Sequence, residues 1–250
     1  MMRTATGYIW SAITGTAMGS LMMVSAQAEE PPCPFDENRA GLCGYYKSEI
    51  SPAEAYLHTV VQRGFVNLGS GGRLGNPLLR AVIVDVRSIP EYKAGHPERS
   101  YNVPYPFIYQ FCDERGRHPD GACVARTSQI DQNDADFLSY IQKIIPNQDT
   151  PIYLLCRTGV RSVAAGNLLT DAGYTHVRNI WEGFVGVFLT APKLQEDGSR
   201  VISAVDLNHD LVLDDRDKNG WRYHQGLPYE TRLLPWLMYQ PMADLYTWVD

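Results

Sequence analysis

Short apolar runs along the chain mark three predicted strands. Residues 81–86 (AVIVDV) and 151–155 (PIYLL) are mostly apolar from end to end, which is typical of strands buried on both faces of a sheet. Residues 176–180 (HVRNI) predict a further strand. Fully buried strands of this kind occur mainly in parallel sheets, where helices cover both faces.

Three helices are predicted around these strands from capping residues and from apolar residues at helical spacing. Their expected extents are Ser51 to about Gln62, Asp131 or Asn133 to Ile145 ahead of Pro146, and Ser162 to Ala172 ahead of Gly173. Strands that alternate with helices predict an α/β fold, with a central parallel sheet and helices on both faces.

The composition supports a folded chain with a core of its own. Of the 250 residues, 44% are hydrophobic and 20% are charged, which excludes wholesale disorder. The formal net charge is −6, and no run of lysine or arginine offsets it. We therefore expect no nucleic-acid partner, because such partners are bound through basic surfaces.

The first 28 residues have the pattern of a secretory signal peptide. They carry one charge, Arg3, and are otherwise apolar and small up to the ending Ser25-Ala26-Gln27-Ala28. That ending suits signal peptidase, so cleavage after Ala28 is predicted. The alternative is an uncleaved membrane anchor, which the hydroxyl side chains within the stretch disfavour. We expect a periplasmic or secreted protein with no membrane span after cleavage.

Five cysteines in an exported protein imply disulfides and one thiol left over. Cys33 and Cys43 flank a short stretch, and Cys112 and Cys123 flank a polar one. Each pair is expected to close a surface loop, although four cysteines allow three connectivities. Pairing of these four leaves Cys156 as the thiol of interest.

Cys156 follows a predicted strand and precedes a predicted helix, which is where ligands bind in open α/β sheets. Helix amides and two arginines favour a thiolate over a thiol there, and Gly159 lets successive amides curl toward the sulfur. The alternative is a buried structural cysteine. We predict that Cys156 is a catalytic nucleophile and that the turn after it stabilises the thiolate; this turn comprises Arg157, Thr158, Gly159, Val160, Arg161 and Ser162.

The chain resembles rhodanese, or sulfurtransferase, domains in several motifs that occur in the family's order. The active-site pattern Cys-x-x-Gly-x-Arg is matched from Cys156 to Arg161. The other matches are Ile50 to Glu54, Asp85-Val-Arg87, Glu91-Tyr92, Gly95-His96, Asn102-Val-Pro104, Gly220-Trp221 and Gly226-Leu-Pro228. Residues 112–123 and 191–219 look like insertions into this pattern and bear on substrate access.

The resemblance implies a rhodanese-like fold and an enzyme of the thiosulfate sulfurtransferase type. Cys156 would take a sulfane sulfur from a donor such as thiosulfate, hold it as a persulfide and pass it to a thiophilic acceptor. The loop residues from Arg157 to Ser162 would bind the substrate or the persulfide. The implied partners are a small sulfur-containing anion or a persulfide as donor, and a thiol or carrier protein as acceptor. No cofactor is required for this catalysis. Arg161 either attracts the donor or pairs with an internal carboxylate and braces the loop.

The sequence of the Cys156 loop bears on three other possible functions. A non-catalytic accessory protein on a rhodanese scaffold, serving an exported oxidoreductase or a sulfur-oxidation system, is the main alternative, but the intact Cys156 loop favours catalysis. A phosphatase is disfavoured because phosphatase relatives insert one more residue before the arginine than this loop has. A thiol-redox enzyme is disfavoured because the chain has no Cys-x-x-Cys pair. Asp85 and Arg87 are interpreted as a structural pair, and His96 as a turn or core residue.

An acidic segment resembles the calcium loop of EF-hands, and we expect it to hold a structural calcium ion. The predicted ligands are Asp206, Asn208, Asp210, Val212 through its carbonyl, Asp214 and Asp217. Leu211 stands where a glycine makes the sharp turn, and Asp217 replaces the longer bidentate glutamate. A frame shifted to begin at Asp215 has the glycine but lacks the closing acid. A solvated acidic turn is the other alternative.

The predicted organisation has five parts. They are the signal peptide 1–28, a lead-in 29–48, the rhodanese-like domain 49–190, the acidic insertion 191–219, and a closing segment with an aromatic tail at 220–250. The tail is expected to pack across the domain or to serve as a docking surface for a partner.

Overall fold

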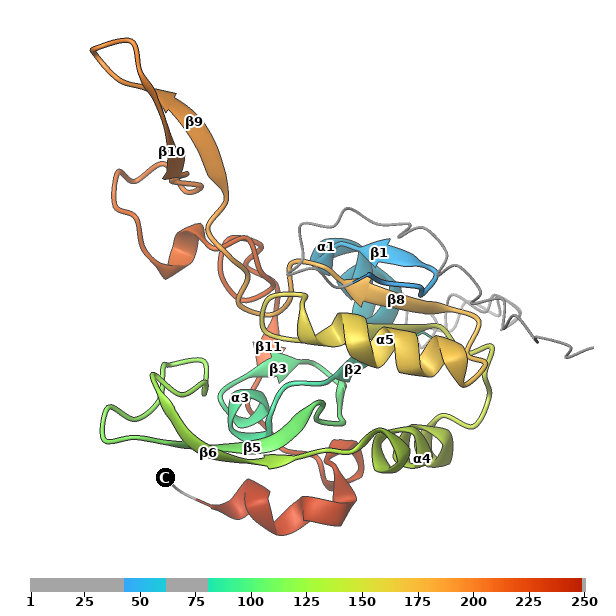
Figure 1. Cartoon of the computed structure of the whole chain (residues 1–250). Coiled ribbons are helices and arrows are strands. Elements are labelled where there is room, and N and C mark those ends of the chain that lie inside the picture. The colour runs from blue at the N-terminus through green and yellow to red at the C-terminus, as the bar shows by residue number, and fades with distance from the viewer. Residues whose placement is uncertain (1–42, 62–80, 249–250) are drawn as a thin grey trace, which may run out of the picture. The chain divides into compact units, whose positions relative to one another are not determined.

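A five-stranded parallel sheet forms the centre of the structure, a computed structural model that describes residues 43–61 and 81–248 (Figure 1). The strands follow the order β1-β8-β7-β2-β4, and each neighbouring pair is parallel. They are β1 (Ser48–Ile50), β2 (Val82–Asp85), β4 (Tyr101–Asn102), β7 (Ile152–Leu155) and β8 (Val177–Ile180). The three predicted strands are therefore confirmed as β2, β7 and β8.

Alternating side chains of the strands divide the core into two clusters, one on each face of the sheet. Val84 of β2 and Leu154 of β7 lie in one cluster, and their neighbours Ile83 and Tyr153 lie in the other. Because successive residues of a strand point to opposite faces, a strand buried on both sides must be apolar throughout. This explains the apolar runs of the sequence.

Helices cover both faces of this sheet, as predicted. They are α1 (Pro52–Tyr56), which continues as the π-helix η1 (Leu57–Val61), α3 (Ile89–Lys93), α4 (Asp134–Ile144) and α5 (Arg161–Asp171). Side chains from α3, α4 and α5 pack into the first cluster, whereas Ala55 of α1 packs into the second with Phe184 and Trp221. Of the two caps considered for α4, Asn133 is the one found, since its side chain accepts a hydrogen bond from the Asp136 amide.

Several short elements outside the sheet were not predicted. Two antiparallel hairpins pair β5 (Phe107–Cys112) with β6 (Arg126–Asp131), and β9 (Thr190–Leu194) with β10 (Arg200–Ala204). The other elements are β3 (His96–Pro97), β11 (Tyr229–Glu230), and the 3-10 helices η3 (Asp215–Asp217), η4 (Pro235–Leu237) and η5 (Gln240–Thr247). Residues 191–219 thus contain a hairpin and a helical turn rather than a plain loop.

The predicted disulfide arrangement is confirmed where the structure describes it. Cys112 and Cys123 are bonded, with an S–S distance of 2.04 Å, and Cys156 is a free thiol. Cys43 is also disulfide-bonded, and its predicted partner Cys33 lies outside the described residues, as does the predicted signal peptide. Among the described residues, none of the helices has both the length and the apolar character needed to cross a membrane.

Both ends of the described chain pack into the same core, and this changes the expected boundaries. Tyr46 is buried in the first cluster, so the fold begins before residue 49. In the C-terminal segment Tyr239, Leu245 and Tyr246 are buried in that cluster, and the Tyr246 hydroxyl donates to Asn102 at 2.6 Å. The first expectation for the tail, packing across the domain, is therefore confirmed.

Candidate active site

Cys156 lies at the carboxyl end of β7, directly before the turn that leads into α5. Among the described residues, two groups donate hydrogen bonds to its sulfur: the Gly159 amide at 3.1 Å and the Ser162 hydroxyl at 3.3 Å. Gly159 has a φ of +81°, a conformation that L side chains rarely adopt, and this turns its N–H toward the sulfur. Of the successive amides expected to face the sulfur, the Gly159 amide is the one found among the described residues.

The buried side-chain amide of Asn179 stabilises this arrangement. Asn179 of β8 donates to the Gly159 carbonyl at 3.0 Å and accepts a hydrogen bond from the Ser162 hydroxyl at 2.6 Å. A hydroxyl has one hydrogen, so Ser162 gives it either to Asn179 or to the Cys156 sulfur. Negative charge on the sulfur would draw that hydrogen toward Cys156. Asn179 carries a role that the sequence analysis did not assign.

Arg161 braces the loop and does not point into an open donor site. Its guanidinium donates to both carboxylate oxygens of Glu91 at 2.8 Å and 2.6 Å, and the two side chains are 18% and 2% exposed. Burial alone would raise the pKa of Glu91, but Arg161, with smaller contributions from Arg87 and Ser88, lowers it to about 2. Burial also opposes the charge of Arg161, yet Glu91 raises the pKa of this guanidinium. Of the two roles considered for Arg161, the internal pair is the one found.

Arg157 is also paired, with a carboxylate from the loop between Cys112 and Cys123. Its Nε and Nη2 both lie 2.8 Å from Oδ2 of Asp120. The Arg157 carbonyl accepts hydrogen bonds from the amides of Val185 and Gly186, which fixes the backbone beside the sulfur. Thr158 and Val160 are half-buried in the same turn and complete the predicted loop.

The residues interpreted as structural form a buried network next to Cys156. Arg87 pairs with Asp85, both side chains are fully buried, and Arg87 also donates to the Gly95 carbonyl at 2.7 Å. His96 stacks on Tyr92 with ring centres 3.7 Å apart, and burial lowers the pKa of this histidine. The structural interpretations of Asp85, Arg87 and His96 are thereby confirmed.

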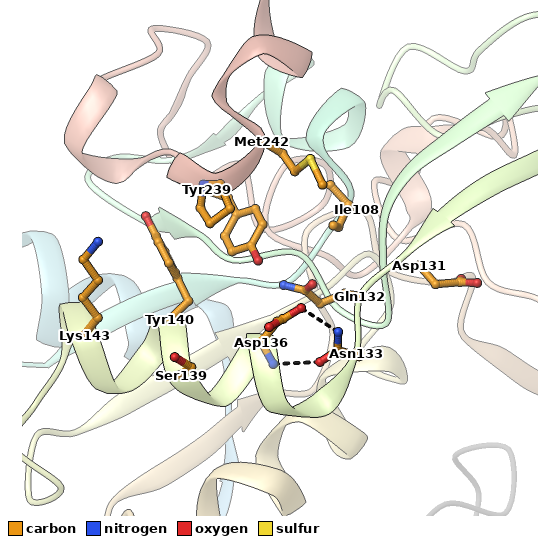
Figure 2. A pocket seen from close by; sticks show the side chains of 11 residues that line it. Ile108, Asp131, Gln132, Asn133, Asp136, Ser139, Tyr140, Lys143, Tyr239 and Met242 are labelled. Carbon is orange, nitrogen blue, oxygen red and sulfur yellow. Dashed lines mark hydrogen bonds between the residues drawn. The ribbon is translucent and has the colours of Figure 1, made fainter.

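The Cys156 side chain has no solvent-exposed surface in this structure. A pocket of about 420 Å³ lies elsewhere, between α4 and the C-terminal segment, and shares no residue with the Cys156 loop. Figure 2 shows Asp136, Tyr140 and Lys143 of α4 on one side of this pocket, with Tyr239 and Met242 across from them.

The predicted calcium ligands have protein partners in this structure. Arg216 pairs with Asp210 at 2.7 Å and with Asp214 at 2.8 Å, while both oxygens of Asp217 accept backbone amides. Asp206 accepts from the amide of Leu211, which takes the left-handed conformation at a φ of +68°. Over the part of the chain that is described, no three His, Cys, Asp or Glu side chains converge as metal ligands. Calcium binding stays a prediction.

Two carboxylates at the site were not identified from the sequence as partners of the loop arginines. Glu91 belongs to a quoted motif, but nothing in its spacing indicates that it meets Arg161, 70 residues later. Asp120 lies in an insertion, 37 residues before Arg157. The pair of arginines was itself a signal, because two cations in one partly buried turn favour anionic partners.

Comparisons with known proteins agree with the motifs. The family model described as "Rhodanese-like domain" matches residues 73–189. "Uncharacterized protein RP600" of Rickettsia prowazekii (strain Madrid E) is 44% identical over 107 residues, which are 42% of this chain and 71% of that protein. "Rhodanese-like domain-containing protein 17" of Arabidopsis thaliana is 31% identical over 104 residues, or 41% of this chain, and the match spans about half of that relative, 54%.

Among solved structures, the chain is similar to the one titled "Crystal structure of Rv0390 from M. tuberculosis". The two share 26% sequence identity, the match covers 75% of this chain and 99% of that one, and the TM-score is 0.42.

Proposed function

The chain belongs to the rhodanese-like domain family, and on this basis we propose that it is a sulfurtransferase that carries a sulfane sulfur on Cys156. The observation that carries the proposal is the free Cys156 thiol at the end of β7, where the Gly159 amide and the Ser162 hydroxyl both reach its sulfur. Donors placed in this way stabilise negative charge on a sulfur as an oxyanion hole does on oxygen.

The proposed reaction has two steps. In the first, the Cys156 thiolate attacks the outer sulfur of a small sulfur-containing anion or persulfide donor, and the donor's sulfur–sulfur bond breaks as the rest of the donor leaves with the electron pair. In the second, a thiol or carrier-protein acceptor attacks the outer sulfur of the Cys156 persulfide, and Cys156 leaves as a thiolate. The protein supplies donors to the anionic sulfur in both steps, and no cofactor takes part.

Phosphoryl transfer is disfavoured by the arrangement of the loop arginine. An enzyme of that kind needs its loop arginine for the phosphate, whereas Arg161 here is held by two hydrogen bonds to Glu91. Sulfur transfer does not need that arginine for a phosphate, and the Gly159 amide and the Ser162 hydroxyl already donate to the Cys156 sulfur.

One observation favours a second candidate function, that of an accessory protein on a rhodanese scaffold. The Cys156 sulfur is fully buried, and a protein that only docks an exported oxidoreductase or a sulfur-oxidation partner needs no access to it. Sulfur transfer requires the Cys156 thiol, whereas docking of a partner does not. Replacement of Cys156 therefore distinguishes the two functions.

We also propose that the protein is periplasmic or secreted. The Cys112–Cys123 bond and the oxidised Cys43 support this, because disulfides persist in oxidising compartments. The mass of the purified native protein tests it: the proposal requires a chain that begins at Glu29, and a chain that retains Met1 in the cytoplasm would overturn it.

The test of the sulfurtransferase proposal is turnover with a sulfane sulfur donor and cyanide as acceptor, followed as thiocyanate. The parent protein should turn over, and Cys156→Ser should lose this activity while it keeps the parent's unfolding midpoint. Turnover that survives in Cys156→Ser would exclude the mechanism. A parent protein that is folded and inactive with every donor would support the accessory function instead.

A further inference from the structure

The disulfide-closed loop 112–123 places a buried carboxylate against the active-site turn. Asp120 is 3% exposed and meets the guanidinium of Arg157, which is 30% exposed, at 2.8 Å. Arg157 directly follows Cys156 in the chain. A buried carboxylate is costly unless it is paired, and here its partner is the arginine that follows Cys156.

The loop holds Asp120 in place by contacts that do not involve Arg157. The Ala122 amide donates to the other oxygen of Asp120 at 3.1 Å, and the Pro119 carbonyl accepts a hydrogen bond from Arg222 at 3.2 Å. Gly121 has a φ of +83° and packs so closely on α3 that a Cβ there would lie 2.2 Å from the Pro90 carbonyl oxygen. The negative charge is therefore part of the site before any substrate arrives.

This placement changes the charge that a sulfur donor meets. Arg161 is neutralised by Glu91 and Arg157 by Asp120, so both cations of the Cys156 loop are already paired. The pKa of Asp215 is lowered mainly by the hydrogen bond from Lys218, with a smaller contribution from the charge of Arg157. Arg157 therefore also interacts with a second carboxylate. These two arginines thus offer no unpaired cation to a donor with two negative charges, and the formal net charge of the whole chain is −6.

Resting on the sulfurtransferase function proposed above, we infer that Asp120 makes the site select against the dianion thiosulfate and for the persulfide of a small organic thiol. The two donors differ in the charge of the reacting group and of the leaving group. With thiosulfate, the sulfur–sulfur bond breaks and sulfite leaves with two negative charges. With R–S–SH, the Cys156 thiolate attacks the outer sulfur, that sulfur keeps its proton, and R–S⁻ leaves with the electron pair and one negative charge.

The experiment compares kcat/KM for thiosulfate and for cysteine persulfide in the parent, Asp120→Asn and Asp113→Asn. Asparagine keeps the oxygen that accepts from Ala122 and removes the charge that faces Arg157. Asp113 is the matched control, because it lies in the same loop and pairs with Arg115 instead. We expect the parent to favour the persulfide, and Asp120→Asn to raise kcat/KM for thiosulfate about ten-fold, with less than a two-fold change for the persulfide. Asp113→Asn should change neither value.

The outcomes separate this inference from the proposed function. If neither donor loads sulfur onto Cys156 in the parent, the sulfurtransferase proposal fails. If both donors react but Asp120→Asn leaves their ratio unchanged, or lowers both values equally, the selection by charge is wrong while the function stands.

A measurement on the parent alone covers the case in which Asp120→Asn does not fold. Added salt should raise kcat/KM for thiosulfate more than for the persulfide, because salt screens the repulsion of a dianion. Equal salt responses for the two donors would overturn the inference.

Discussion

The guanidinium of Arg161 at the start of α5 meets both carboxylate oxygens of Glu91 in α3, at 2.8 Å and 2.6 Å. Glu91 also accepts hydrogen bonds from the amide and the hydroxyl of Ser88. The pair thus ties the end of the Cys156 loop to the helix that follows β2. It gives the loop a fixed shape, and its cation is already paired within the protein.

Removal of the Glu91 charge should destabilise the protein. The pKa of Glu91 falls from 4.5 to about 2 in the folded state, which corresponds to about 3 kcal/mol at neutral pH. Glu91→Gln should lower the free energy of unfolding in urea by about that amount. Glu54→Gln is the control, because Glu54 and Arg178 form an exposed pair at 3.4 Å that should contribute less than about 1 kcal/mol. Equal effects of the two substitutions would contradict the role of the buried pair.

The same pair predicts how stability depends on pH. A carboxylate with a lowered folded-state pKa stabilises the protein above its unfolded value of 4.5, and the contribution is lost as the pH falls through about 2. The difference in unfolding free energy between the parent and Glu91→Gln should therefore shrink to less than half at about pH 3. Urea titrations at neutral and acidic pH measure it. A difference that stays constant down to that pH would show that Glu91 is not held as a charged partner of Arg161.

Ser162 is expected to speed sulfur transfer through its hydrogen bond to Cys156. Ser162→Ala removes one of the two donors to the sulfur and leaves the Gly159 amide, so the transfer rate should fall about ten-fold. Thr170→Ala serves as the control, since Thr170 lies on the same helix and its hydroxyl donates to the Gly166 carbonyl, away from Cys156. Single-turnover rates with a fixed donor give the comparison. An unchanged rate in Ser162→Ala would indicate that the Ser162 hydroxyl donates its hydrogen to Asn179 and not to the Cys156 sulfur.

The Cys112–Cys123 bond should stabilise the protein by closing the loop that carries Asp120. The two cysteines are 11 residues apart, and closure of a loop of this size is worth about 2–3 kcal/mol. A variant with both Cys112→Ser and Cys123→Ser should lose that amount in urea unfolding without any reductant present. A loss near zero would mean that the loop keeps its structure without the bond.

The acidic loop gives a test of calcium binding. Arg216 and a calcium ion would compete for Asp210 and Asp214, so Arg216→Gln should gain more thermal stability from added calcium than the parent does. Unfolding midpoints with calcium and with a chelator provide the measurement. Midpoints that do not respond in either protein would rule out a calcium site in this loop.

The sequence predicts the centre of the fold well, because burial leaves a clear pattern there. The runs that became β2 and β7 are apolar on both faces, and Gly159 marks the turn after Cys156. The β9–β10 hairpin was missed for the opposite reason, since every residue of β9 is exposed and no apolar face marks it. In β6 the side chains are exposed or half-buried, and the strand has no run to identify it.

The partners of the site were harder to predict than its motif. The Cys-x-x-Gly-x-Arg pattern located the free thiol of Cys156 and the turn after it, both of which depend on adjacent residues. The pairing of Arg157 with Asp120 depends on where an insertion folds back, which hydrophobic spacing does not encode. If the proposed selection by charge holds, the specificity of the site depends on a part of the chain that the motif does not cover.

The most direct test of the account is the intact mass of the protein after incubation with a sulfane sulfur donor. We predict a gain of one sulfur, about 32 Da, that maps to Cys156, that cyanide removes, and that is absent in Cys156→Ala. No gain in mass, or a gain that persists in Cys156→Ala, would contradict the assignment of Cys156 as the sulfur carrier.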